Sequence, residues 1–394
     1  MSYMFRESGP LKPGALIGIL GGGQLGRMTA LAAKQMGYRI AVLDPDADAP
    51  AMQVADRKFV AKYTDRDAAR DLARACDVVT YEFENIDAET AEAVADLKQL
   101  HPSDGVLRIT QHRVREKEAM RASGVATAPF RPVTSQADLR EAVSEVGLPA
   151  VIKTATSGYD GKGQVVIQEE SQVFAAYEQL KRLSSMHIFE RYVPFKMEIS
   201  VIVGRDASGR TLAFPASENI HVDSILDVSI APARVGRAVA DDARGLASGI
   251  AEHLGLIGLL AVEMFVTKDD ELLVNELAPR PHNSGHYTID ACRTSQFQQL
   301  VRILTGLPMG AVEMPRPAAM VNLLGDVWLD SKTEPDWAGA LSLPGVSLHL
   351  YGKKEPKRGR KMGHLTAVAA DIEVALARVL EARERASRRS RSAR

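Results

Sequence analysis

Two glutamates are spaced so that they could share a divalent cation. Glu263 lies six residues before Asp269, and Glu276 lies six residues after Asp270. Strand-like apolar runs flank the two aspartates, and aspartate tolerates the left-handed backbone that tight turns require. A hairpin centred on these aspartates sets the two glutamates directly opposite each other, with Cβ atoms about 5 Å apart.

Such a pair favours cation binding because it is costly without a cation. Like charges directly opposite each other destabilise a hairpin, and carboxylates among apolar residues are unfavourable when unpaired. Carboxylate oxygens suit Mg²⁺, and substrate phosphates can complete its coordination. We therefore predict a magnesium site at Glu263 and Glu276. The alternative is a pair of solvent-facing acids on an edge hairpin.

A glycine-rich segment follows the apolar run 147–154, a predicted strand that carries Lys153. The segment Gly158–Gln164 reads GYDGKGQ, and its three glycines allow the backbone to approach a phosphate and offer N–H groups. It is not a P-loop, because no GK[ST] opens a helix here. We predict a flap between antiparallel strands, with Lys153 and Lys117 as phosphate ligands. A plain loop is the alternative.

A second glycine-rich segment lies near the N-terminus. Gly21–Gly26 satisfies G-x-G-x-x-G between a predicted strand and a predicted helix, and Asp44 ends the next strand. This arrangement is typical of dinucleotide-binding folds and leaves an NAD-dependent oxidoreductase open. Physically, the pattern requires only an anion at a helix N-terminus, so a ribose phosphate would serve as well. The NAD hypothesis gives no role to Glu263, Glu276 or the flap.

The order of strands and helices predicts how these segments are positioned. Strands at 15–20, 39–43 and 77–81 alternate with helices at 25–36 and 87–97, which indicates an N-terminal, Rossmann-like parallel sheet. From residue 113 the pattern changes to α+β with mainly antiparallel hairpins. From about residue 315, short strands lead to a last helix at 372–385. The predicted fold class is therefore α/β and α+β multidomain, with domains at 1–112, 113–314 and 315–394.

The amino-acid composition argues against nucleic acid and membranes as partners. The 394 residues are 45% hydrophobic and 25% charged with a formal net charge of −1, so no global field points to nucleic acid or membrane. The Arg-rich tail 383–394 is interpreted as a solvated end. Cys76 and Cys292 match no metal or redox spacing and indicate a reducing, cytoplasmic setting. The first fourteen residues lack the apolar region of a signal peptide, and the run 254–262 is too short to span a bilayer.

Five motifs, taken in order, carry a family resemblance that covers about residues 17–366. They are GGGQLGRM (Gly21–Met28), SGYDGKGQ (Ser157–Gln164), VEMFV (Val262–Val266), NELAPRPHNSGH (Asn275–His286) and GRKMGHL (Gly359–Leu365). The sequence resembles the ATP-grasp superfamily and, within it, the N5-carboxyaminoimidazole ribonucleotide synthetases. This resemblance implies a pre-ATP-grasp Rossmann-like domain, a two-lobed ATP-grasp domain and a small β-rich C-terminal domain.

The resemblance also implies an activity. An ATP-dependent carbon–nitrogen ligase would carboxylate 5-aminoimidazole ribonucleotide with bicarbonate through carboxyphosphate, releasing ADP and phosphate, in de novo purine biosynthesis. ATP is then a substrate and Mg²⁺ a cofactor. The resemblance further suggests a cytoplasmic homodimer with a functional link to a mutase subunit.

The resemblance implies a role for individual residues of this sequence. The residues expected to bind ATP are Arg113, Lys117, Lys153, Gly158, Tyr159, Asp160, Gly161, Lys162, Gly163, Gln164, Glu190, Arg191, Tyr192, Val193, Glu198, His221, Asn275 and Glu276. The residues expected at the bicarbonate site, which include the catalytic ones, are Arg280, His282, Asn283 and Ser284. The residues expected to bind the ribonucleotide are Gly22, Gly23, Gln24, Leu25, Glu82, Lys353, Arg360 and Lys361. The run after Tyr351 is about one residue longer than the family pattern, so Lys354 competes with Lys353.

Several residues keep a second interpretation. His282 could accept a proton, since imidazole titrates near neutral pH, or could lie with His286 on a polar surface loop. Pro281 and Gly285 argue against the helix that a zinc pair at this spacing needs. Arg280 could instead form a structural ion pair with one of the two glutamates.

Two further function classes stay open. A formate-using phosphoribosylglycinamide formyltransferase is the nearest rival, and the run Asn283–His286 is the discriminating feature because that enzyme typically lacks it. A non-catalytic nucleotide sensor on the same scaffold would not need the intact lysines and glutamates. The basic residues of the C-terminal region could also form a solvated loop.

Overall fold

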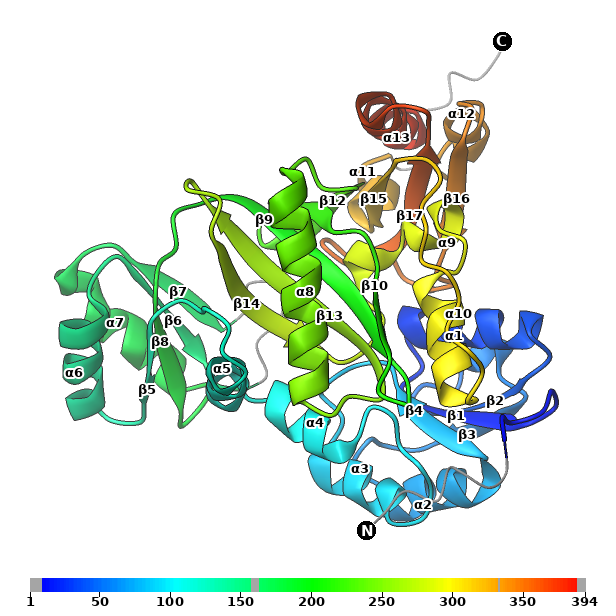
Figure 1. Cartoon of the computed structure of the whole chain (residues 1–394), viewed down its shortest axis with the longest axis horizontal. Helices are drawn as coiled ribbons and strands as arrows, with labels where there is room; N and C mark the ends of the chain where they lie inside the picture. Colours follow the sequence, from blue (N-terminus) through cyan, green and yellow to red (C-terminus); the bar gives the residue numbers. More distant parts are fainter. Residues whose placement is uncertain (1–8, 157–162, 332–333, 388–394) are drawn as a thin grey trace.

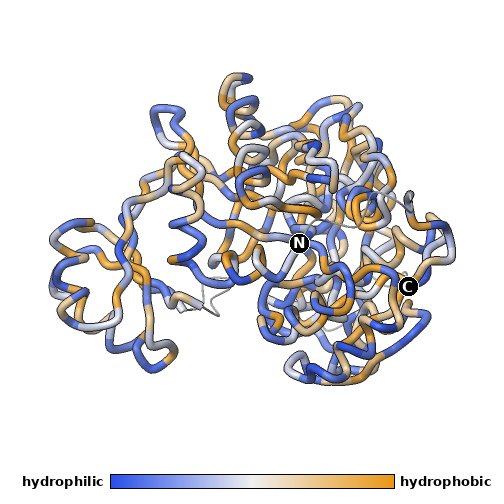
Figure 2. The backbone as a smooth tube through the Cα atoms, turned by 60° about the horizontal axis from the view of Figure 1, so that its bottom comes forward, coloured by the Kyte–Doolittle hydropathy of each residue, from blue (hydrophilic) through white to orange (hydrophobic). Residues whose placement is uncertain are grey.

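The computed structural model describes residues 9–156, 163–331 and 334–387. The strands within these ranges form three sheets, a four-stranded parallel sheet, a four-stranded antiparallel sheet and a nine-stranded sheet (Figure 1). Hydrophilic stretches follow the outer loops and hydrophobic stretches run through the interior (Figure 2). The mixed α/β and α+β class predicted from the sequence is confirmed.

The N-terminal sheet is parallel throughout, in the order β3-β2-β1-β4. Its strands are β1 (Leu16–Leu20), β2 (Arg39–Asp44), β3 (Arg57–Val60) and β4 (Val78–Tyr81). The helices beside it are α1 (Gln24–Gln35), α2 (Arg66–Ala75), α3 (Ala88–Ala95) and α4 (Asp104–Thr110). Alternate residues of β1 enter two different cores, one containing α1 and the other α2 and α3. The sequence did not reveal β3, because this edge strand is charged and largely exposed.

The small antiparallel sheet has the order β5-β8-β6-β7. Its strands are β5 (Phe130–Val133), β6 (Ala150–Thr154), β7 (Gln164–Ile167) and β8 (His187–Arg191). Its core is shared with α6 (Gln136–Val146) and α7 (Glu170–Lys181). The strand predicted from residue 147 begins only at Ala150, because Gly147 caps α6 with a φ of 73°. Helix α5 (Arg113–Ala122) leads into this lobe.

The nine-stranded sheet runs β14-β13-β9-β11-β12-β15-β17-β16, with β10 paired to β9. Its central part comprises β9 (Phe195–Arg205), β10 (Thr211–Ala213), β11 (Ser217–Val222), β12 (Ile225–Ala231), β13 (Gly258–Thr267) and β14 (Leu272–Ala278). Its C-terminal part comprises β15 (Ala318–Leu324), β16 (Val346–Leu350) and β17 (Lys361–Val368). Because β15 pairs with β12, the β-rich C-terminal region continues the central sheet.

Helices cover this long sheet and join it to the N-terminal sheet. Helix α8 (Arg237–His253) lies across one face of the central strands (Figure 1). Helix α10 (Gln296–Leu304) packs between that sheet and α1, in the same core as β1. Helix α13 (Ile372–Ser387) covers the C-terminal strands. Shorter helices are α9 (Thr288–Ala291), α11 (Asp326–Ser331) and α12 (Trp337–Leu341), with 3-10 turns at Met52–Val54 and Asn283–Gly285.

The predicted glutamate hairpin is confirmed, with Glu263 opposite Glu276 on β13 and β14. Val266 pairs with Leu272, so the turn is centred on Asp269 rather than between the two aspartates. Continuing that register would set Asn275 opposite Glu263. A β-bulge at this point adds one residue to β14 and restores the predicted pairing. Asp270 takes the left-handed conformation expected of the turn, with a φ of 65°.

Core packing of β13 generates a stability prediction. Leu260 is fully buried under α8, so Leu260→Ala should lower the free energy of unfolding by about 2–5 kcal/mol through lost burial and a cavity. Urea denaturation measures the change. Val60→Ala on edge strand β3, where Val60 is 57% exposed, is the control and should stay within about 0.5 kcal/mol of the parent. Equal effects of the two substitutions would contradict this assignment of the core.

Candidate functional site

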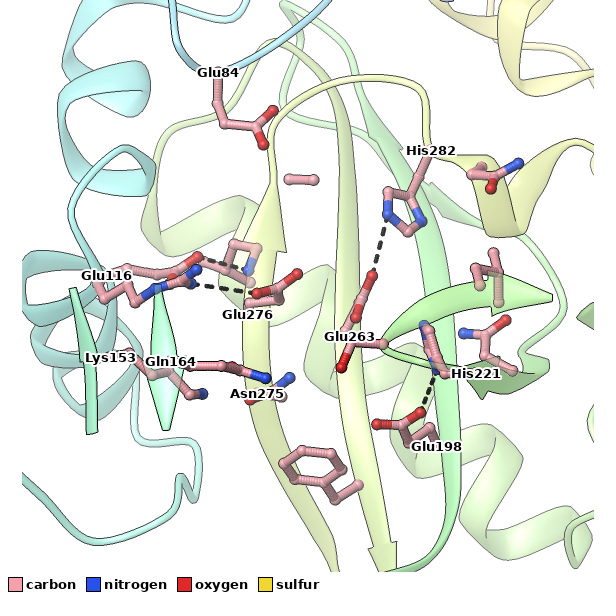
Figure 3. A pocket seen from close by; sticks show the side chains of 18 of the residues that line it. Glu84, Glu116, Lys153, Gln164, Glu198, His221, Glu263, Asn275, Glu276 and His282 are labelled. Atoms are coloured by element: carbon pink, nitrogen blue, oxygen red, sulfur yellow. Dashed lines mark hydrogen bonds and ion pairs between the residues drawn. The ribbon is translucent and has the colours of Figure 1, made fainter. Parts of the chain in front are cut away.

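One cleft of about 840 Å³ lies where the three sheets meet. The turn after β1, the segment after β4, α5, the small sheet and strands β9, β11, β13 and β14 all contribute side chains (Figure 3). Most residues predicted for the site line it: Gly23, Gln24, Leu25, Glu82, Arg113, Lys153, Gln164, Glu190, Arg191, Tyr192, Val193, Glu198, His221, Glu263, Asn275, Glu276, Arg280, His282, Asn283 and Lys361.

Other predicted residues lie behind the cleft wall or outside the described ranges. Those that do not line the cleft are Gly22, Lys117, Gly163, Ser284, Lys353 and Arg360. Gly158, Tyr159, Asp160, Gly161 and Lys162 belong to the segment 157–162, which lies outside the described residues. The flap prediction therefore stays untested at its tip, although β6 and β7 on either side are antiparallel as predicted.

The two glutamates of the hairpin stand at the centre of the cleft (Figure 3). The Oε1 atom of Glu263 lies 3.1 Å from His282 Nε2, and Glu276 Oε2 lies 3.4 Å from Arg113 Nη1. In a regular strand, neighbouring side chains point to opposite faces, but the bulge lets Asn275 and Glu276 both line the cleft.

The charge state of Glu263 suits a cation ligand. Burial alone would raise the pKa of Glu263, but the hydrogen bond from His282 and the charges of His282, His221 and Arg280 lower it to about 2. The donor set offers two carboxylates and the amide oxygen of Asn275, which fits Mg²⁺ better than a soft metal. Within the described part of the chain, no group of three or more His, Cys, Asp or Glu side chains could hold a metal by itself. Phosphate oxygens or water would have to complete the coordination.

A carboxylate holds two lysines at the small sheet. Lys153 Nζ lies 3.0 Å and Lys117 Nζ lies 3.9 Å from Glu190 Oε2. Burial alone would raise the pKa of Glu190, but the charges of the two lysines lower it to about 2. Lys153 faces the cleft, whereas Lys117 is buried behind it. Lys117 therefore contacts Glu190 from behind the cleft wall and does not itself face the cleft.

Two carboxylates that line the cleft, those of Glu84 and Glu116, are absent from the predicted site residues. The Glu84 carboxylate accepts a bidentate pair from Arg280, including Nη2 to Oε1 at 2.9 Å, so the partner of Arg280 is neither Glu263 nor Glu276. Burial alone would raise the pKa of Glu84, but the charge of Arg280 lowers it to about 2. Glu84 belongs to the run Tyr81–Asn85 (YEFEN), which follows a predicted strand and is expected to face the ribonucleotide, but only Glu82 of this run was selected as a site residue.

Glu116 is the second missed carboxylate. It is buried on α5 and accepts a hydrogen bond of 2.6 Å from the Leu277 N–H, next to the bulge that carries Glu276. Burial and the nearby charge of Glu276 raise the pKa of Glu116 to about 8. No local sequence pattern distinguishes Glu116 from an ordinary helical glutamate, because its partner lies 161 residues away.

The N-terminal glycine loop binds protein carboxylates. Glu82 accepts hydrogen bonds from the N–H groups of Gly23 and Gly26, the latter at 2.7 Å, and Asp44 accepts one from Gly22 at 2.7 Å. These N–H groups are the ones a dinucleotide pyrophosphate would need. The two carboxylates would also repel it, so the dinucleotide hypothesis is wrong for this loop.

One end of the cleft is apolar and flat. Phe265 stacks on Phe195 with ring centroids 4.7 Å apart and planes 7° from parallel. Val151, Val166, Met197 and Val193 line the same cleft. At the polar edge, Glu198 and His221 form a hydrogen bond (Figure 3). Burial alone would lower the pKa of His221, but the Glu198 carboxylate raises it. This slot suits a heteroaromatic ring with a polar sugar beside it, and only Val193 among its apolar residues was predicted.

Basic residues of the C-terminal strands approach the cleft from the side of the N-terminal sheet. Lys361 lines the cleft, and Lys353 Nζ donates to the Lys361 carbonyl at 2.7 Å. Lys354 is exposed and pairs with Asp48, so Lys353 is the lysine that turns inward. Arg360 Nη1 donates to the Glu355 carbonyl at 2.9 Å, away from the lining residues. The surface-loop alternative fails for His286, which is fully buried.

Three family models match in order: the ribonucleotide synthetase preATP-grasp domain at residues 15–111, the ATP-grasp domain at 118–297 and the phosphoribosylaminoimidazole carboxylase C-terminal domain at 318–378.

Full-length relatives cover nearly all of the chain. An N5-carboxyaminoimidazole ribonucleotide synthase of Bacillus subtilis is 51% identical over 354 residues, covering 90% of this chain and 91% of the relative. The N5-carboxyaminoimidazole ribonucleotide synthase of Brucella melitensis is 43% identical over 360 residues, covering 91% of this chain and 97% of the relative. A solved N5-carboxyaminoimidazole ribonucleotide synthetase in its ADP complex superposes with a TM-score of 0.89 at 48% identity, covering 95% and 98%. The Aspergillus clavatus N5-carboxyaminoimidazole synthase in complex with ADP and 5-aminoimidazole ribonucleotide superposes with a TM-score of 0.87 at 34% identity. The match covers 95% of this chain and 99% of that structure.

The pairing of Glu190 with Lys117 and Lys153 predicts that substitution of Glu190 lowers stability in a pH-dependent way. Glu190→Gln leaves Lys117 buried without its counter-charge, so the free energy of unfolding should fall by about 3–5 kcal/mol at pH 7. The folded pKa of Glu190, about 2, lies below the ordinary value of 4.5, so its contribution is present above pH 4.5 and is lost as the pH falls toward 2. The difference in free energy of unfolding between parent and variant, measured by urea denaturation, should therefore become smaller as the pH falls from 4.5 toward 2.

Glu145→Gln is the matched control, because Glu145 forms an exposed pair with Arg131. It should change the free energy of unfolding by no more than about 1 kcal/mol at any pH. A Glu190→Gln deficit that stays constant between pH 7 and pH 3 would contradict the charge pairing described above.

Proposed function

This chain belongs to the N5-carboxyaminoimidazole ribonucleotide synthase family, ATP-dependent ligases of purine biosynthesis with the ATP-grasp fold, and we propose that it carboxylates 5-aminoimidazole ribonucleotide in the cleft around Glu263 and Glu276. ATP and bicarbonate are the other substrates, and ADP and phosphate leave. The observation that carries the proposal is the meeting of three charged groups in one cleft: the Glu263–Glu276 pair, Lys153 with Glu190, and Arg280 with Glu84. The relatives named above are carboxylating synthases, so the formate-using alternative is not favoured.

The proposal places ATP between the apolar slot and the glutamate pair. The adenine ring lies against Phe265, with the backbone of residues 190–193 reading its edge, and the ribose lies against Glu198 and His221. Arg113 and Lys153 would contact the phosphates, and the phosphate-binding role predicted from the sequence for 158–164 is part of the same proposal. These cations offset the charge of the transferring phosphoryl group, which is the main protein contribution to such reactions.

The metal proposal rests on the oxygen donors of the hairpin. Glu263 and Glu276, with the Asn275 side chain, would hold Mg²⁺, and the ion would neutralise phosphate charge as a Lewis acid. The low pKa of Glu263 keeps this carboxylate ionised at neutral pH.

Bicarbonate and the aminoimidazole occupy the remaining space beyond the glutamates. Arg280, already oriented by Glu84, offers N–H donors to the bicarbonate oxygens, and Asn283 is held in place by two hydrogen bonds with Asn322 at 2.7 and 3.1 Å. A bicarbonate oxygen attacks the γ-phosphorus, and ADP leaves. Carboxyphosphate breaks down to CO₂ and phosphate, and the exocyclic amine then attacks the carbon of CO₂, forming the C–N bond and losing a proton to a base. Carboxyphosphate is labile in water, so the reaction needs a closed site.

The ribonucleotide side of the proposal uses the two loops that meet near Glu82. Lys353 and Lys361 supply positive charge for its phosphate, and Glu82 with the loop 22–25 lies on the opposite side. A proton-acceptor role for His282 would require one of its two present contacts, to Glu263 or to Ser284, to open.

The remaining expectations are also proposals. The domain limits 1–112, 113–314 and 315–394 are supported by the breaks between the family models. The cytoplasmic setting is proposed from the family resemblance and from the spacing of Cys76 and Cys292 in the sequence. No helix in the described ranges is long and apolar enough to cross a membrane. The homodimer and the link to a mutase rest on the family resemblance, and light scattering of the purified protein tests the former.

The substrate assignment predicts coupled ADP release. Purified protein with Mg-ATP and bicarbonate should release ADP faster when 5-aminoimidazole ribonucleotide is added, because the amine consumes the CO₂ that forms from carboxyphosphate. A coupled spectrophotometric assay measures the rate. Formate with glycinamide ribonucleotide is the matched control and should leave the rate at background. Stimulation by that pair, or none by the aminoimidazole, would sink the assignment.

The metal proposal predicts a severe defect for Glu276→Gln. Removing one carboxylate should lower kcat on the order of 100-fold or more, corresponding to about 3 kcal/mol of lost transition-state stabilisation. Titrating Mg²⁺ in the same assay should show weaker saturation. Glu271→Gln, an exposed position at the turn of the same hairpin, is the control and should match the parent. Undiminished turnover by Glu276→Gln would remove the metal role of this hairpin.

A further inference from the structure

A buried glutamine at the start of α10 reaches the segment that carries the predicted bicarbonate residues. Gln296 is fully buried and does not line the cleft. Its Oε1 accepts a hydrogen bond of 2.9 Å from the His282 backbone N–H, and its Nε2 donates one of 2.8 Å to the His282 carbonyl, which also accepts from the Gly285 N–H at 3.0 Å. One side-chain amide thus pairs with both backbone groups of a single residue, as a neighbouring strand would.

The orientation of this amide follows from its partners. A backbone N–H can only donate and a carbonyl can only accept, so the amide oxygen must face the first and the amide nitrogen the second. Nε2 also lies 3.2 Å from Nδ1 of His286. The packing is tight, because a Cβ atom added at Gly285 would lie 2.8 Å from Gln296 Oε1, closer than such atoms normally approach. The glycine therefore lets the segment lie directly against the amide.

The helix that carries Gln296 anchors it. Ser295 and Gln298 form a capping box at the start of α10, and the Gln296 N–H donates to Thr288 Oγ1 at 3.0 Å. Thr288 in turn donates to the Gly285 carbonyl at 2.6 Å. The apolar side chains of α10 are buried in the core that contains β1 and α1. The amide therefore has a fixed position relative to the N-terminal core.

The site residues on either side of His282 are held by side-chain partners. Arg280 pairs with Glu84, and Asn283 pairs with Asn322 through two hydrogen bonds. Both pairings join side chains, whereas Gln296 holds the backbone that lies between them. Because these side chains project from one short stretch of chain, a shift of this backbone would move the groups on both sides of it.

We propose that Gln296 is a positioning residue, which fixes the backbone at His282 and thereby sets the places of Arg280 and Asn283, the groups proposed above to bind bicarbonate. The catalytic consequence rests on that proposed function. The role of Gln296 depends on two hydrogen bonds to backbone atoms, so it holds whichever ring nitrogen of His282 carries a proton. A misplacement of about 1 Å that originates away from the reacting groups can lower a rate on the order of 100-fold.

The direct test follows the His282 backbone amide in the whole chain without substrates. Protein labelled with ¹⁵N-histidine gives amide signals from its nine histidines, and the signal that is lost in His282→Gln belongs to His282. Exchange of this amide with deuterated solvent should be at least about 10-fold faster in Gln296→Met, which keeps the length of the side chain but removes the amide. Unchanged exchange in Gln296→Met overturns the proposal.

Gln299→Met is the matched control. Gln299 lies one turn further along α10, is also fully buried, and accepts a hydrogen bond of 2.9 Å from the Gly310 N–H rather than from the segment 280–285. Its substitution should leave the exchange of the His282 amide at the parent rate. Equal acceleration by both substitutions would show a general loosening of α10 and would contradict a specific role for Gln296.

A second substitution keeps the test decisive if Gln296→Met does not fold. Gln296→Asn retains a polar amide but is one methylene shorter, so it should not reach both backbone groups of His282. We expect the same faster exchange as in Gln296→Met. Exchange and turnover at the parent level in Gln296→Asn would rule out positioning by this side chain.

Kinetics provide the second readout. In Gln296→Met, kcat/KM for bicarbonate should fall at least about 10-fold while KM for ATP stays within about twofold, and Gln299→Met should match the parent. A parallel rise in KM for ATP would indicate general distortion of the cleft, and faster exchange with unchanged kcat/KM for bicarbonate would separate the segment from the reaction. Either result overturns the proposal. An inactive parent would sink the proposed function, yet amide exchange would still decide whether Gln296 holds the segment.

Discussion

Strand β13 is paired on both sides, with β14 and with β9, so its register fixes which side chains meet at the centre of the cleft. Leu260, Val262 and Met264 pack under α8, whereas Glu263 and Phe265 line the cleft. A slip of one residue would exchange the two faces, burying the carboxylate under α8 and moving Val262 into the site. The apolar packing on one face therefore positions the chemistry on the other.

Charges in this cleft are arranged in pairs before any ligand arrives. Glu263 faces His282, Glu276 faces Arg113, Glu190 holds Lys153, and Glu84 holds Arg280. Each carboxylate is costly to bury alone, and its partner offsets that cost. In the proposed function, the same pairing would pre-orient donors toward an incoming phosphate or bicarbonate, so little reorganisation would be needed during reaction. The contacts that stabilise the fold would then also serve binding, and a change at one partner would affect both.

Features that depend on the spacing of residues close together in the sequence were predicted correctly. The glutamate pair follows from a short hairpin, and the parallel N-terminal sheet follows from alternating strands and helices. The bulge at Asn275 was not visible, because it depends on how β14 packs beside α5. The Arg280–Glu84 pair spans 196 residues, and no periodicity reports a contact over that distance.

The N-terminal glycine loop shows how tertiary contacts change the use of a local motif. The strand, glycines and helix form as the pattern predicts, but Glu82 and Asp44 reach the N–H groups from neighbouring strands. Burial raises the pKa of Glu82, and the charge of Lys353 acts in the opposite direction. Gln53 also donates to the Gly352 carbonyl at 2.9 Å, which ties the C-terminal strands to this sheet. The motif therefore builds one wall of a site whose opposite wall comes from the far end of the chain.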